Sequence, residues 1–81
     1  MTKPVVLEDV AFERMRQDER WGEQNHEDFV WGAILGEEVG EVSRAMLEDR
    51  FGAGSNLRDE LVQVAAVAIA WIECIDRRAS R

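Results

Sequence analysis

Two short stretches, Glu37-Glu38-Val39-Gly40-Glu41 and Glu60-Leu61-Val62-Gln63, decide the fold and function that we expect for this chain. Both are predicted to be helical, and side chains three or four residues apart share one face of a helix. Glu38 and Glu41 therefore lie side by side, with Glu37 one turn before Glu41. Glu60 and Gln63 form a second oxygen-bearing pair. Carboxylates on one face repel each other unless a cation sits between them, and oxygen ligands suit Mg²⁺ or Mn²⁺.

The surrounding pattern predicts three helices and no strand. The expected helices run from about Val5 or Leu7 to about Asp18, from about Glu27 to about Asp49, and from about Leu57 to about Arg77. Candidate N-caps are Asn25 or Asp28 for the second helix and Ser55 or Asn56 for the third. The chain has 81 residues, which indicates one domain. We therefore expect an all-α fold, with a single helical domain spanning residues 1–81.

Each helix is expected to bury one stripe of apolar side chains. The predicted inward positions are Val6, Val10 and Met15 in the first helix, Leu35, Val39, Val42 and Met46 in the second, and Leu61, Val64, Ala68, Trp71 and Ile75 in the third. Glu13, Arg14 and Arg16 are expected to face outward. The third helix is apolar on more than one face, so we expect it to be central and to meet another subunit near Ala66 and Ala70. Oligomerisation would complete four-helix-type bundles, because one small core gives limited stability.

Composition and charge argue against several classes of protein. The chain is 46% hydrophobic and 33% charged, which is typical of a globular domain. Its net charge of −7 argues against nucleic acid or an anionic membrane surface as a partner. The single cysteine, Cys74, fits a reducing cytoplasm and is expected to be a packing residue. The N-terminus lacks a signal-peptide pattern, and the apolar run from Val64 to Ile72 is too short to span a bilayer.

The two acidic pairs are expected to meet in one cleft. The second and third helices should pack antiparallel across the Gly-rich turn at residues 52–56, which brings the later part of one helix beside the start of the other. Glu38 flanks the apolar stripe of the second helix, and Glu60 flanks that of the third. A solvated helix face is the alternative, because Glu is a good helix former and Glu-rich exposed faces are common.

With these residues in place, the chain resembles a known family. Glu-Glu-x-x-Glu followed by Glu-x-x-Asp on the next helix is the signature of the all-α nucleoside triphosphate pyrophosphohydrolases, the MazG-like superfamily. Glu37, Glu38 and Glu41 match the first half, and residues 18–26 look like the loop that leads into the family's metal helix. The resemblance covers about residues 13–73. In the second half, Gln63 stands where the family has Asp.

The resemblance implies a metal-dependent hydrolase that cleaves a nucleoside triphosphate between its α- and β-phosphates. It implies Glu38, Glu41, Glu60 and Gln63 as ligands of Mg²⁺ or Mn²⁺, and Glu37 and Glu38 as catalytic residues, with Glu37 a further ligand or a water-orienting base. Divalent ions neutralise phosphate oxygens and lower the pKa of a bound water, and a nearby carboxylate can take its proton. The amide of Gln63 can bind a cation through oxygen but brings no charge, so metal affinity should fall.

Substrate contacts are expected from the loop before the second helix. Trp21 would stack on a base, with hydrogen bonds to its edge from Gln24, Asn25 and His26, or else would close the core at a helix end. Arg44, Arg50 and Arg58 would hold phosphates or form salt bridges with the surplus acids. Trp31 and Trp71 are expected in the core. His26 has no histidine partner at metal spacing, so a loop or capping role is the alternative for it.

The expected function is therefore a Mg²⁺-dependent nucleoside triphosphate pyrophosphohydrolase that clears the nucleotide pool, as a cytoplasmic homo-dimer or homo-tetramer. Because Gln63 departs from the family pattern, two other interpretations stay open. One is a non-catalytic MazG-like protein that binds a nucleotide or a protein partner, and the other is a helical interaction module. The sequence pattern does not specify the base or sugar that such a site prefers.

Overall fold

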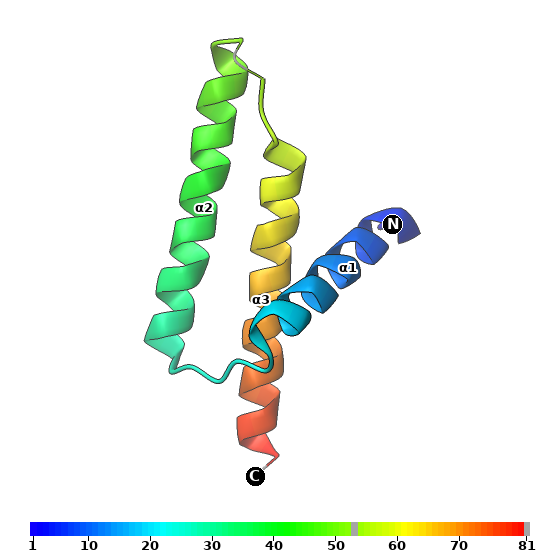
Figure 1. The fold of residues 1–81 in the computed structure, drawn as a ribbon, viewed down its shortest axis with the longest axis vertical. Helices are drawn as coiled ribbons and strands as arrows, with labels where there is room; N and C mark the ends of the chain where they lie inside the picture. The colour runs from blue at the N-terminus through cyan, green and yellow to red at the C-terminus, as the bar shows by residue number, and fades with distance from the viewer. Residues whose placement is uncertain (53, 81) are drawn as a thin grey trace.

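The computed structural model describes residues 1–52 and 54–80, which form three helices joined by two short connections (Figure 1). Helix α1 spans Pro4–Trp21, α2 spans Asp28–Arg50 and α3 spans Leu57–Ala79. The described residues include no strand, so the predicted all-α class is confirmed. The first helix extends further than expected, and Trp21 is its last residue rather than part of the following loop.

Helix α3 is central, as its apolar composition predicted. Helix α3 runs antiparallel beside α2. Helix α1, which begins near the N-terminus, crosses α3 (Figure 1). Within the described part of the chain, α1 and α2 each contact α3 and do not contact each other. Helices α1 and α2 therefore pack on α3 separately, and residues 22–27 connect them. No helix among the described residues has the length and apolarity needed to cross a membrane.

The connection between α1 and α2 follows from local backbone chemistry. Gly22 ends α1 with a φ of +71°, and its N–H donates to the carbonyl of Asp18 at 2.8 Å. Glu27 is the N-cap of α2, so the prediction of Asn25 or Asp28 at this position is wrong. Asp28 instead lies in the first turn of α2, where a negative charge favours the helix dipole.

The second connection contains two glycines with positive φ, Gly52 and Gly54. Gly52 has a φ of +76°, which a residue with a side chain adopts at a cost, and it follows the last turn of α2 directly. Asn56 is the N-cap residue of α3, as predicted, although its side chain makes no capping hydrogen bond. The neighbouring Ser55 partly fills that role, because its Oγ accepts the N–H of Leu57 at 3.3 Å.

The core lies between α2 and α3. Trp31 is only 2% exposed and packs against three small or medium side chains of α3, namely Val67, Ala70 and Cys74. The small side chains let α2 approach, and the indole ring fills the space that they leave. Trp31 in the core and Cys74 as a packing residue agree with the sequence prediction. Trp71 is half-buried at the rim of this cluster, and its indole N–H donates to Asp28 at 3.0 Å.

The apolar stripes predicted from spacing are partly wrong. The buried face of α3 is formed by Ala66, Val67, Ala70 and Cys74, whereas Leu61 and Ile75 are exposed in the single chain. Val6, Met15, Val39 and Met46, which were also expected inward, are exposed. In α3 the reason is that most of the large apolar side chains lie on the exposed face, whereas mostly small residues form the buried face, so the spacing of large apolar residues selects the wrong face. Ala66 and Ala70 pack inside the chain rather than against another subunit.

The outer face of α3 remains uncovered. Leu61, Ile69, Ile72 and Ile75 are exposed, and their helical spacing sets them opposite the buried face. Isolated apolar residues on a surface are ordinary, but four on one helix face form a stripe. The chain thus has a second apolar side that its own helices do not bury.

Candidate active site

Glu38 is the centre of the acidic residues. It follows Trp31 and precedes Ala45 by seven residues each, so all three lie on the side of α2 that faces α3. Glu38 is half-buried there. Burial is the largest cause that raises its pKa, and the nearby carboxylates of Glu60, Glu41, Glu37 and Glu13 raise it further, in that order. Carboxylates from all three helices therefore surround this one group.

Two of the other predicted acidic residues, Glu41 and Glu60, have partners of their own. Glu41 is exposed, with Oε2 at 3.7 Å from Arg44 Nη1. Glu60 Oε1 accepts a hydrogen bond from Asn56 Nδ2 at 3.0 Å. Among the described residues, no three Asp, Glu, His or Cys side chains are arranged as a ready-made metal site. A cation at Glu38 would therefore require Glu41 and Glu60 to turn away from these partners.

Glu13 belongs to the acidic group, and the prediction that it faces outward is wrong. It is 6% exposed and lies on the side of α1 that packs against α3. Its carboxylate accepts hydrogen bonds from Arg16 and Gln17, so its burial is compensated. The signal in the sequence is the spacing of Val10, Glu13 and Gln17, which continues the inward face of α1 through polar residues.

A series of side-chain hydrogen bonds centred on Gln17 joins α1 to Gln63. Arg14 Nη1 donates to Gln17 Oε1 at 3.0 Å, and Gln17 Nε2 lies 3.3 Å from Glu13 Oε2. The same Gln17 Nε2 donates to Gln63 Oε1 at 3.2 Å. Gln63, which the sequence placed beside Glu60 as a metal ligand, therefore has its oxygen turned toward α1.

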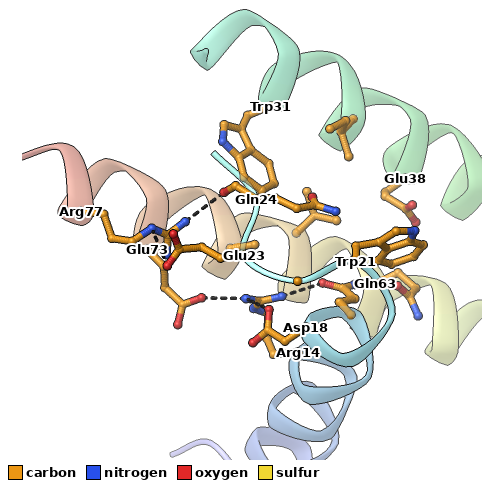
Figure 2. Close-up of a pocket in the computed structure, with 15 residues that line it drawn as sticks. Arg14, Asp18, Trp21, Glu23, Gln24, Trp31, Glu38, Gln63, Glu73 and Arg77 are labelled. Carbon is orange, nitrogen blue, oxygen red and sulfur yellow. Dashed lines mark hydrogen bonds and ion pairs between the residues drawn. The ribbon is translucent and has the colours of Figure 1, made fainter. Parts of the chain in front are cut away.

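A cleft of about 680 Å³ is lined by residues of all three helices and of the connection between α1 and α2. Four residues of the predicted site line it: Trp21, Gln24, Glu38 and Gln63. Figure 2 shows Glu38, Trp21 and Gln63 together at one end, and Arg77 with Glu73 and Glu23 at the other. Trp21 is 56% exposed, so it does not close the core within this chain. One face of its indole carries the Arg20 guanidinium, 4.9 Å from the ring centroid.

Two arginines that the sequence analysis did not select line this cleft. Arg14 pairs with Asp18 and Glu73, each at 2.9 Å. Arg77 holds the loop after α1 through the Gln24 carbonyl at 2.9 Å and Asn25 Oδ1 at 3.1 Å. Their inward positions can be read only after the buried faces of α1 and α3 are known, because both residues follow an apolar position by one turn.

Three predicted substrate contacts lie outside the cleft lining. Asn25 binds Arg77 and the carboxylate of Glu23. His26 packs edge-on against Trp31, with ring centroids 4.9 Å apart, as a loop residue over the core. Arg58 pairs with Asp9 at 2.8 Å on the other side of the contact between α1 and α3. The structure thus unites four predicted residues in the cleft lining and leaves six outside it, namely these three together with Glu37, Glu41 and Glu60.

Comparisons with protein-family models, with curated proteins and with solved structures found no match.

Proposed function

We propose that this chain is a Mg²⁺-dependent nucleoside triphosphate pyrophosphohydrolase related to the MazG-like superfamily. The observation that carries the proposal is Glu38, a half-buried carboxylate at one end of a cleft, with four further glutamates near enough to raise its pKa. Such a group is unfavourable in the folded state unless a cation neutralises it. Its oxygen chemistry suits Mg²⁺ or Mn²⁺.

In this proposal Glu38, Glu41 and Glu60 hold the metal. When bound, the ion neutralises phosphate oxygens and lowers the pKa of a water that attacks phosphorus. Glu37 lies beside this group on the exposed side of α2, in a position to orient that water and take its proton. Gln63 is assigned to the metal by the resemblance, but its oxygen faces Gln17, so the proposal gives the metal the three glutamates.

The substrate would lie along the cleft. Trp21 offers an exposed indole beside Glu38 for stacking on a base, and Gln24 offers an amide on the connecting loop. A protein with a net charge of −7 binds a triphosphate only where a cation or hydrogen-bond donors offset the repulsion. Arg14 and Arg77 line the cleft and supply hydrogen-bond donors, and each is also paired with carboxylates, Arg14 with Asp18 and Glu73 and Arg77 with Glu23.

We propose further that the chain assembles into a homo-dimer or homo-tetramer through the outer face of α3. Leu61, Ile69, Ile72 and Ile75 are exposed on this face, and the small core of one chain gives limited stability. Light scattering at micromolar concentration should give at least twice the mass of one chain. Ile72→Glu should yield monomers with the same helicity, while a monomeric wild type would contradict the proposed assembly.

The enzymatic proposal is tested by a panel of nucleoside triphosphates with Mg²⁺, assayed for pyrophosphate release. Glu38→Gln should lower turnover by about a hundredfold or more. Glu48→Gln, an exposed position on the same helix, is the matched control and should retain activity. Binding of a triphosphate without turnover would instead favour the second candidate, a non-catalytic nucleotide-binding protein. The neutral side chain of Gln63 supports this candidate.

A further inference from the structure

The orientation of the Gln17 side-chain amide is fixed by its two charged neighbours. Arg14 Nη1, which can only donate, lies 3.0 Å from one end of the amide. The carboxylate of Glu13, which can only accept, lies 3.3 Å from the other end. Turning the amide over would break both contacts, so its oxygen faces Arg14 and its nitrogen faces Glu13.

This orientation determines the orientation of Gln63. The Gln17 nitrogen lies 3.2 Å from the Gln63 amide, and a donor requires an acceptor opposite it. The Gln63 atom on this side is therefore Oε1, and its Nε2 is turned away from Gln17. Gln63 lines the cleft, and within residues 1–52 and 54–80 no acceptor takes a hydrogen bond from its Nε2.

We propose that Gln63 donates a hydrogen bond from Nε2 to a phosphate oxygen of the ligand in the cleft, and that Gln17 is the positioning residue that sets this polarity. The inference rests on the proposed function, because it takes a phosphate ligand from there. A carboxylate at position 63 would repel phosphate unless a metal bridged the two. An amide N–H attracts phosphate directly, which suits a cleft lined by the carboxylates of Glu23, Glu38 and Glu73.

The test measures Mg²⁺ and phosphate binding separately, by calorimetry, with Mg²⁺ alone and with inorganic tripolyphosphate in the presence of Mg²⁺. Gln63→Leu removes the donor at similar size and should weaken tripolyphosphate binding about tenfold, with Mg²⁺ binding unchanged. Gln63→Glu keeps an acceptor, loses the donor and should bind tripolyphosphate more weakly still. The inference is overturned if Gln63→Leu weakens Mg²⁺ binding and Gln63→Glu tightens it, since that pattern belongs to a metal ligand.

The role of Gln17 is tested by coupling. Gln17→Met removes the amide and frees Gln63 to turn, so tripolyphosphate binding should weaken by less than in Gln63→Leu. In the Gln63→Leu background, Gln17→Met should cause no further loss, because the group that it orients is already absent. Equal losses in both backgrounds would mean that Gln17 acts only structurally. Thermal melting of each variant verifies that it is folded during these measurements.

The inference and the proposed function can fail separately. If the wild type releases pyrophosphate and Gln63→Leu binds tripolyphosphate as tightly as the wild type does, only the donor role of Gln63 is refuted. If the wild type neither cleaves a triphosphate nor binds tripolyphosphate, both are refuted. If it binds without cleaving and the Gln63 variants behave as described, the donor role holds while hydrolysis does not.

Discussion

The two contacts of α3 differ in kind. Its contact with α2 is apolar, with Trp31 seated on the small side chains of Ala70 and Cys74. Its contact with α1 buries Val10 but also carries polar side chains across it, such as Gln17 with Gln63 and Arg14 with Glu73. The candidate site lies where these two contacts meet, in the cleft that all three helices line.

The difference separates stability from orientation. Apolar burial is roughly proportional to area and has no direction, so the contact with α2 holds the helices together without orienting single atoms. Hydrogen bonds require a donor and an acceptor in fixed places, and they cost free energy when one partner is missing. The polar part of the contact with α1 determines which atoms Gln63 presents to the cleft.

The largest effect is expected from breaking the apolar contact. Trp31→Ala removes a side chain that is 2% exposed and leaves a cavity beside Ala70 and Cys74. Replacing a buried Trp by Ala costs about 3–5 kcal/mol, which is a large share of the stability of a small domain. Urea unfolding followed by circular dichroism measures the loss. Trp21→Ala, at an exposed tryptophan, is the control and should cost less than about 1 kcal/mol.

A smaller effect is expected from removing Glu13, the buried carboxylate of α1. Glu13→Ala removes a buried acceptor and leaves Gln17 and Arg16 without it. An unpaired group of this kind costs about 1–3 kcal/mol. Glu8→Ala, at an exposed position on α1, should change stability by less than about 0.5 kcal/mol. Equal unfolding free energies for the two variants would show that the buried carboxylate of Glu13 contributes no stability.

The same contrast explains what the sequence could predict. The three helices, the central position of α3 and the burial of Trp31 follow from composition, spacing and the Gly-rich turn. The buried face of α3 does not follow, because Leu61 and Ile75 are as apolar as the residues that are buried. The spacing of large apolar residues points to the face of α3 that this chain leaves exposed, because mostly small residues form the buried face.

The polar part of the site was harder to predict. Glu38 was found because its motif is short and regular, whereas Glu13 was missed because a glutamate is seldom buried. Arg14 and Arg77 became candidates only once their helices were packed. The orientation of Gln63 depends on Gln17, which is far from Gln63 in the sequence. No local sequence pattern could therefore predict this orientation.

The pH dependence of stability tests the carboxylates around Glu38. The folded-state pKa of Glu38 is raised, so its contribution to stability is complete below the unfolded pKa and is lost as the pH rises through the folded pKa. Glu38→Gln should therefore be more stable than the wild type at pH 7, and its stability should fall less between about pH 4 and neutrality. Melting temperatures across this range measure the difference. A variant no more stable than the wild type at pH 7 would mean that the carboxylates do not destabilise the fold.

Magnesium should make the wild type more stable than Glu38→Gln, which reverses the order of stability expected without metal. Several millimolar Mg²⁺ should raise the melting temperature of the wild type, because a ligand that binds only the folded state stabilises it. The response should be weaker in Glu38→Gln and unchanged in Glu48→Gln, which alters an exposed carboxylate further along α2. An equal response in all three proteins would mean that the acidic group is a solvated helix face and not a cation site.

The smallest effect is expected from Arg58, and it defines the limit of the site. Arg58 was predicted to hold phosphate, but it pairs with Asp9 in an exposed ion pair outside the cleft lining. Such pairs contribute about 0–1 kcal/mol, so Arg58→Ala should barely change the melting temperature. It should also leave the KM for triphosphate unchanged. Arg77→Ala should raise that KM, because Arg77 holds the loop that carries Gln24. If Arg58→Ala raises the KM as much as Arg77→Ala does, the substrate extends past α1, and the phosphate-binding role predicted for Arg58 would be restored.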